Sequence, residues 1–147
     1  MIQRAQDLVP VLRERAEATE NNRAVSTDTH AEFQDSGFYR IFQPEAFGGL
    51  EMDIGLMVDL AAEIGRGCGS SAWIFTNIAV HGLINGMKDP KCQQELWGDD
   101  PGTVIASAHP GKDAHVEEVD GGLLVDGIWN YSSGVDFASW VNLQIFL

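Results

Sequence analysis

Residues 70–85 read SSAWIFTNIAVHGLIN, and this stretch decides how the helical part of the chain is arranged. It predicts a helix with apolar side chains on nearly every side, which is typical of a helix at the centre of a bundle. Trp73, Asn77 and His81 are spaced four residues apart, so they share one stripe of this helix. Two interpretations of the stripe stay open: it is the wall of a pocket, or His81 is a hydrogen-bonded histidine of the core.

The segments before and after this helix predict further helices. Apolar residues recur at helical spacing from Ala5 to Ala16, where Pro10 either opens the helix or kinks it. Ser26 to Asp28 and Asp53 offer caps for two more helices, and Asp89-Pro90 is typical of a cap followed by a first-turn proline. The expected helices cover about residues 5–16, 26–37, 53–66 and 89–98, and residues 42–53 are expected to form an irregular loop.

After Pro101 the pattern changes from helices to strands. Residues 104–107 and 140–147 are strand candidates, and Asp120-Gly121-Gly122 predicts a hairpin between two further strands. Helices followed by strands predict an α+β chain. We expect a helical N-terminal domain over residues 1–100 and the beginning of an incomplete, antiparallel, barrel-like β-domain over residues 101–147. A sheet of so few strands has an unpaired edge. Either another chain completes the sheet or the chain is a fragment.

Composition excludes several classes of function. The 147 residues are 44% apolar, enough for a packed core, and the formal net charge of −13 repels nucleic acids and anionic membranes. The most apolar run is shorter than the roughly 20 residues of a membrane span, and we see no signal peptide, so a soluble cytoplasmic protein is expected. Cys68 and Cys92 are expected to be free thiols, with a disulfide as the alternative. The histidines show no metal-ligand spacing, so no metal site is predicted.

Hydroxyl side chains at the ends of expected strands are the other candidates for chemistry. Ser107 lies where a strand runs into a loop, and Ser132 and Ser133 follow Trp129 in the sequence WNYSS. Each has a plain structural interpretation as well. Ser107 could satisfy local backbone, and the WNYSS segment could be a surface turn.

Four segments resemble one known family. Residues 37–50, GFYRIFQPEAFGGL, are similar to the GxxRxxxPxxxGG stretch of acyl-CoA dehydrogenase relatives. Residues 70–73, SSAW, and 94–98, QELWG, resemble helix segments of the flavin monooxygenase branch of that family. Residues 120–140 are similar to its DGG hairpin and its W-x-x-SSG-x-x-x-A-x-W signature. The chain therefore resembles the N-terminal part of the acyl-CoA dehydrogenase-like flavin monooxygenases.

The resemblance implies a function and a set of site residues. It implies the oxygenase component of a two-component hydroxylase of the hydroxyphenylacetate or hydroxy-seco-steroid type, acting on a small aromatic substrate through a flavin C4a-hydroperoxide. Reduced FMN, or alternatively FAD, would come from a separate flavin reductase, and a homo-oligomer is expected. The alternatives are an acyl-CoA dehydrogenase and a truncated, non-catalytic domain, and the chain alone is expected to be inactive. The implied residues are His81 and Ser107 for catalysis, Trp73, Asn77 and His81 for the substrate, and Ser107, Trp129, Ser132 and Ser133 for the cofactor.

Overall fold

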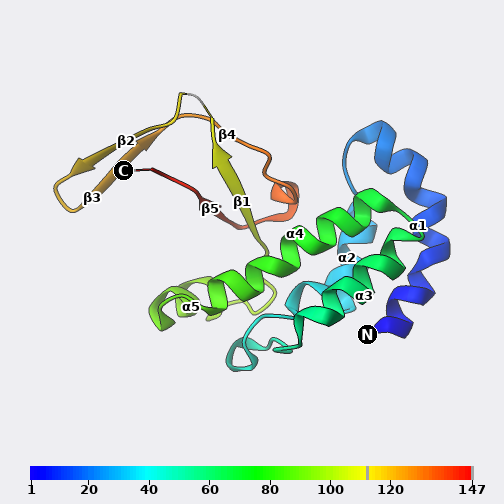
Figure 1. The fold of residues 1–147 in the computed structure, drawn as a ribbon. Coiled ribbons are helices and arrows are strands. Elements are labelled where there is room, and N and C mark those ends of the chain that lie inside the picture. The colour runs from blue at the N-terminus through cyan, green and yellow to red at the C-terminus, as the bar shows by residue number, and fades with distance from the viewer. Residues whose placement is uncertain (112, 147) are drawn as a thin grey trace.

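The computed structural model describes residues 1–111 and 113–146, with helices first and strands after them (Figure 1). The α-helices are α1 (Ile2–Asn22), α2 (Thr27–Asp35), α3 (Ile54–Gly65), α4 (Gly69–Gly86) and α5 (Pro90–Trp97). The strands are β1 (Ile105–Pro110), β2 (His115–Val119), β3 (Gly122–Asp126), β4 (Trp129–Asn130) and β5 (Trp140–Leu143). Short 3-10 helices lie at η1 (Phe38–Arg40), η2 (Glu45–Phe47) and η3 (Val135–Phe137). The predicted α+β class is confirmed.

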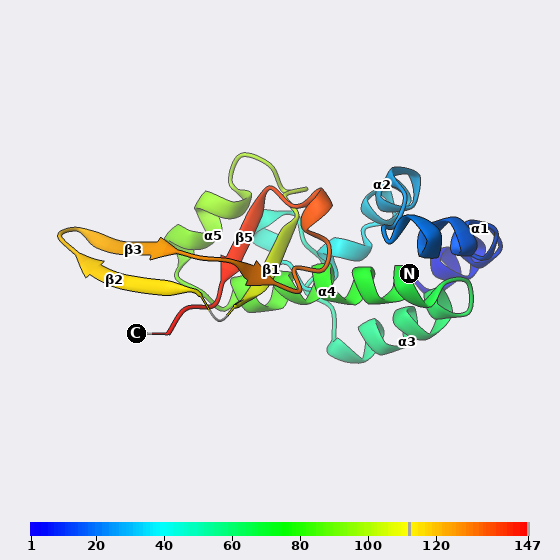
Figure 2. The ribbon, with the colours of Figure 1, turned by 90° about the horizontal axis from the view of Figure 1, so that it is seen from above.

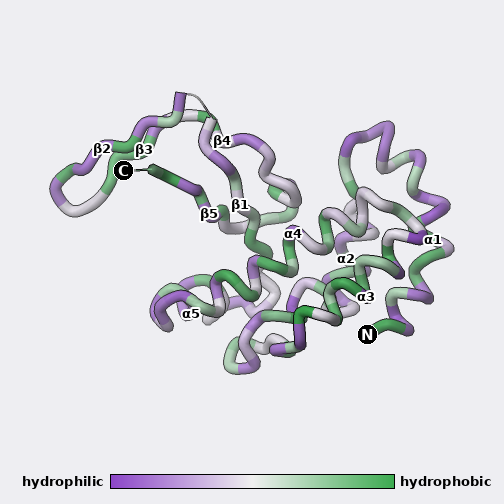
Figure 3. Tube along the Cα trace, viewed as in Figure 1, coloured by the Kyte–Doolittle hydropathy of each residue, from purple (hydrophilic) through white to green (hydrophobic). Residues whose placement is uncertain are grey.

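Helix α4 is the central helix, as its sequence predicts. It contacts α1, α3, α5, η1 and β1, and its Phe75 packs edge-on against Phe33 and Phe38 in the main core. In Figure 3 the hydrophobic segments follow α3 and α4, whereas α1 is largely hydrophilic. Two large apolar residues of α4 are nevertheless exposed, Trp73 at 62% and Ile84 at 41%. Both residues line cavities rather than the core.

The expected helix caps are formed by the expected side chains. Ser26 Oγ accepts a hydrogen bond from Thr29 N at 3.2 Å, at the start of α2. Asp53 Oδ1 accepts from Gly55 N at 2.7 Å, and Asp89 Oδ1 accepts from Lys91 N at 2.8 Å. Each acceptor satisfies a backbone donor that has no partner within its helix. Pro10 lies inside α1, so it does not open that helix.

The irregular loop over residues 42–53 joins η1 to α3 and contacts the segment that precedes β1. Gln43 is buried, and its Nε2 donates to the carbonyl oxygens of Phe47 at 2.7 Å and Pro101 at 2.9 Å. A Cβ atom at Gly49 would lie 1.8 Å from the Gln43 carbonyl oxygen, so only glycine fits there. The loop therefore fixes the backbone just before β1.

The strands form a mixed sheet and a separate hairpin. β1 lies between β4 and β5, antiparallel to β4 and parallel to β5. β2 and β3 pair around Asp120-Gly121, which confirms the predicted hairpin, and Figure 2 shows them projecting away from the helices. Two details of the prediction were wrong: the β1–β5 pair is parallel rather than antiparallel, and the last strand ends at Leu143. Parallel pairing follows because the chain crosses back through η3 between β4 and β5.

Two further expectations can be compared with the described residues. Within residues 1–111 and 113–146, no helix is long and apolar enough to cross a membrane. Cys68 and Cys92 are free thiols rather than a disulfide.

Candidate active site

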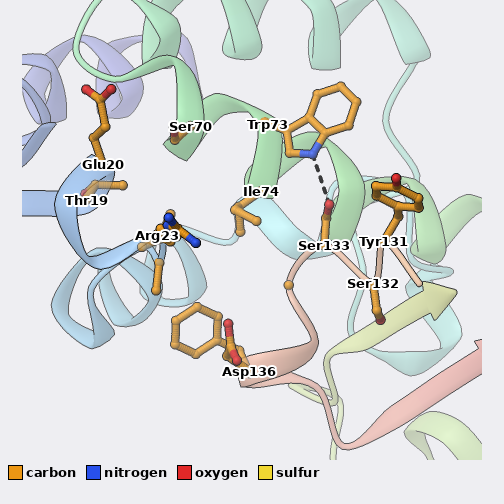
Figure 4. A pocket seen from close by; sticks show the side chains of 14 residues that line it. Thr19, Glu20, Arg23, Ser70, Trp73, Ile74, Tyr131, Ser132, Ser133 and Asp136 are labelled. Atoms are coloured by element: carbon orange, nitrogen blue, oxygen red, sulfur yellow. Dashed lines mark hydrogen bonds between the residues drawn. The ribbon is translucent and has the colours of Figure 1, made fainter. Parts of the chain in front are cut away.

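The loop between β4 and β5 is held against α4 by contacts from several directions. Trp73 Nε1 donates to Ser133 Oγ at 3.0 Å (Figure 4). Gly134 has a φ of 86° and packs so closely that a Cβ there would lie 2.9 Å from Ile78 Cγ1. Phe137 stacks on the His30 ring with centroids 4.0 Å apart. These contacts position Ser132 and Ser133 beside the N-terminal half of α4.

A cavity of about 430 Å³ lies between this loop, the end of α1 and the beginning of α4. Trp73, Ser132 and Ser133 are in its wall (Figure 4). Ser132 Oγ is buried and has no hydrogen-bond partner among the described residues. Ser133 Oγ accepts from Trp73, so its own O–H stays free to donate. The loop cavity, as we call it, therefore offers two serine hydroxyls to a ligand.

A second cavity, of about 410 Å³, lies between the C-terminal half of α4 and the β1–β5 pair. We call it the histidine cavity. It brings together His81 and Ser107, the two residues that the resemblance assigns to catalysis. Its lining residues are His81, Ile84, Lys88, Ser107, Ala108, His109, Asn142, Leu143 and Gln144.

His81 is only 3% exposed, and its environment favours the neutral imidazole. Burial lowers the pKa of His81 below its ordinary value, the carbonyl of Asn77 one turn earlier opposes this effect, and the positive charge of Lys88 adds to it. The Asn77 carbonyl does not form a hydrogen bond with His81, since His81 Nδ1 is buried without a partner among the described residues. A neutral imidazole with unused hydrogen-bonding capacity can accept a proton from a bound acid.

The β1–β5 register adds two residues that sequence reasoning missed. Ser107 and Asn142 are partners across the parallel pair, and Lys88 Nζ donates to Asn142 Oδ1 at 3.1 Å. Both Lys88 and Asn142 line the histidine cavity. Asn142 and Gln144 alternate with apolar residues over residues 141–145, VNLQI, which was a usable signal for one polar face. The pattern does not show that this strand pairs with β1.

The other predicted site residues lie elsewhere. Asn77 Nδ2 donates to the Trp73 carbonyl one turn earlier at 2.8 Å. Trp129 Nε1 donates to the Gln144 carbonyl at 2.8 Å, so its ring lies near the C-terminal ends of β1 and β5. The predicted stripe on α4 is thus divided, because Trp73 lines the loop cavity and His81 lines the histidine cavity. No metal-binding group of three His, Cys, Asp or Glu occurs in the part of the chain that the structure describes.

Comparison with known proteins places these features in a family context. The family described as acyl-CoA dehydrogenase, N-terminal domain, matches residues 5–91. The chain is 40% identical, over 91% of its length, to the flavin-dependent monooxygenase, oxygenase subunit HsaA, of Mycobacterium tuberculosis, and covers 34% of that protein. It is 31% identical, over 95% of its length, to the p-hydroxyphenylacetate 3-hydroxylase, oxygenase component, of Acinetobacter baumannii, and covers 33% of it.

A solved structure agrees with the sequence comparison. The crystal structure of the HsaA monooxygenase from M. tuberculosis superposes with a TM-score of 0.90 and 37% identity. The match covers 97% of this chain and 38% of that one. The chain therefore spans about a third of the length of the curated relatives that it matches.

Proposed function

Because the chain belongs to the acyl-CoA dehydrogenase family through the N-terminal domain at residues 5–91, we propose that it is the N-terminal part of a flavin-dependent monooxygenase that hydroxylates a small aromatic compound. The observation that carries the proposal is the histidine cavity, which is lined by both His81, whose imidazole is neutral, and Ser107. Residues 101–147 would begin its β-domain. Relatives that are named oxygenase subunits or components support an oxygenase that depends on a separate reductase.

The flavin fits the residues around the loop cavity. A flavin ring carries nitrogen and oxygen atoms along one edge, and these accept or donate hydrogen bonds. Ser132 has a buried hydroxyl without a partner among the described residues, and Ser133 has a free O–H. We propose that these two serines hold the polar edge of reduced FMN, with FAD as the alternative. When bound, the reduced flavin supplies the activation of O2 for transfer of one oxygen atom.

His81 would act on the substrate rather than on the cofactor. Its neutral imidazole accepts the proton of a phenol, which raises the electron density of the aromatic ring and makes it a better nucleophile. Ser107 would orient the same phenolic oxygen. Trp73 would line the flavin side of the site, and α4 would exclude water from it.

The competing function is α,β-dehydrogenation of an acyl-CoA, which the name of the matching family favours. A phenol site needs a proton acceptor beside hydroxyl and amide groups, as found at His81, Ser107 and Asn142. This arrangement favours the monooxygenase.

The test uses the complete protein that contains this chain. It is mixed with reduced FMN or reduced FAD, O2 and p-hydroxyphenylacetate or another simple phenol, and the products are identified by mass. A hydroxylated phenol is expected, formed more efficiently with FMN. Oxidation of an acyl-CoA with an electron acceptor, and no hydroxylation of any phenol tested, would overturn the proposal.

A further inference from the structure

One face of the β1–β5 pair is polar where it meets the histidine cavity. Side chains at alternate positions of a strand share a face, so Ser107 and His109 lie together on β1. Asn142 on β5 and Gln144, the residue just after β5, alternate in the same way. The distance of 2.7 Å between His109 Nδ1 and Gln144 Oε1 places their side chains on the same side of the sheet. The preceding pair in register, Ser107 and Asn142, therefore faces that side as well.

Asn142 has a fixed orientation because of Lys88. A lysine ammonium has donors only, so the atom that it contacts at 3.1 Å must be the amide oxygen of Asn142. The other end of the amide, Nδ2, is left as a donor. This atom is buried and has no partner among the described residues. A buried donor without a partner costs about 1–3 kcal/mol, so a ligand that accepts its hydrogen bond is favoured.

The positions of Ser107 and Asn142 allow them to share one ligand atom. Neighbouring strands lie about 4.8 Å apart, so two side chains in register on one face can both reach an oxygen placed between them. The ammonium of Lys88 polarises the Asn142 amide and adds positive charge to this part of the cavity. No acidic residue lines the cavity within the described chain. Such a set of donors matches an oxygen that carries negative charge.

We propose that Asn142, held in place by Lys88, is a substrate-positioning residue that donates its amide N–H to the ionised oxygen of a phenol. The inference rests on the proposed function and deepens it. His81 takes the phenolic proton, and Asn142 and Ser107 bind the phenolate oxygen that remains. Lys88 acts through Asn142 and is itself a positioning residue. The site therefore selects aromatic compounds with an acidic hydroxyl over uncharged aromatic rings of the same size.

The test measures ionisation of a bound phenol without flavin or turnover. 4-Nitrophenol, whose ionised form is yellow, is titrated into the complete protein over a series of pH values. The wild-type protein should make the bound nitrophenol ionise at a lower pH than the free compound. Asn142→Leu removes the donor at similar size, and should weaken phenolate binding roughly 10- to 100-fold, as expected for a hydrogen bond to a charged group.

Further variants separate a binding role from a structural one. Asn142→Asp keeps the size and the contact with Lys88 but brings a negative charge, so it should fold and bind phenolate still more weakly. Lys88→Met should give a partial loss that Lys88→Arg restores. Asn21→Leu, on the exposed end of α1, is the matched control and should bind as the wild type does.

The results can separate a failure of the proposed role of Asn142 from a failure of the proposed monooxygenase function. If the wild type hydroxylates phenols while Asn142→Leu and Asn142→Asp bind nitrophenolate as tightly as it does, the role of Asn142 is wrong and the monooxygenase proposal stands. If the wild type neither binds nitrophenol nor hydroxylates any phenol, both are overturned.

Discussion

His81 lies where helix α4 meets the β1–β5 pair, and its role can be separated from that of the cofactor residues. We predict that His81→Ala in the complete protein lowers the proposed hydroxylation about 10²–10⁴-fold, because the phenol loses its proton acceptor. Oxidation of the reduced flavin should continue, with oxygen released as hydrogen peroxide. The ratio of hydroxylated product to oxidised flavin measures this uncoupling. His115→Ala, in the exposed hairpin, is the control, and an unchanged ratio in His81→Ala would contradict the assignment.

The protonation of His81 gives a second prediction at the residue scale. Only neutral His81 accepts a proton, and burial lowers the pKa of His81 below its ordinary value of 6.5. Hydroxylation should therefore fall only as the pH drops below 6.5 and protonates this imidazole. Lys88→Met removes a charge that lowers this pKa, so the acidic limb of the pH–rate profile should move to higher pH. If the acidic limb of the pH–rate profile does not move in Lys88→Met, the charge of Lys88 does not lower the pKa of His81.

The site residues differ in how far sequence could predict them. His81 and Ser107 were paired through the family resemblance, and the structure lines one cavity with both. Asn142 was not predicted, because its closeness to Ser107 depends on the pairing of two strands far apart in the chain. The orientation of its amide depends in turn on Lys88, in the turn that follows α4. Contacts of this kind leave no periodic signal in the sequence.

The loop that carries Ser132 and Ser133 gives a prediction at the scale of an element. Gly134 and Gly121 have nearly the same φ, 86° and 85°, but only Gly134 packs against Ile78. Gly121→Ala should cost about 1 kcal/mol of unfolding free energy through backbone strain. Gly134→Ala should cost about 1–3 kcal/mol more, because its Cβ collides with the core. Urea unfolding compares the two, and equal losses would show that the loop is not pressed against α4.

Elements were predictable where their signals are local. The caps at Ser26, Asp53 and Asp89 and the turn at Asp120-Gly121 each depend on a few neighbouring residues, and each forms as expected. The parallel β1–β5 pair was missed, because strand direction depends on how the chain crosses through η3. The apolar character of α4 on nearly every side placed this helix at the centre. The sequence left open whether the Trp73 stripe lines a pocket, and it gave no sign that Ile84 faces a cavity.

At the scale of the whole molecule, residues 1–147 should not hold the cofactor tightly by themselves. Residues 113–147 contain no Lys or Arg, and a phosphate group is usually bound by such cations or by a helix N-terminus. The hairpin also leaves Leu123, Leu124 and Val125 exposed. We predict weak or undetectable binding of FMN in a fluorescence titration of this chain, with tighter binding by the complete protein. Micromolar or tighter binding by residues 1–147 would contradict this.

The central claim is that the protein transfers an oxygen atom to an aromatic ring, and isotope labelling tests it most directly. The complete protein is given reduced flavin and a phenol under ¹⁸O2, and the mass of the product is measured. We predict that the hydroxylated product gains a single ¹⁸O atom from O2, and that in His81→Ala the label appears in hydrogen peroxide instead of the product. A hydroxylated product without ¹⁸O, or an acyl-CoA oxidised in place of any phenol, would contradict it.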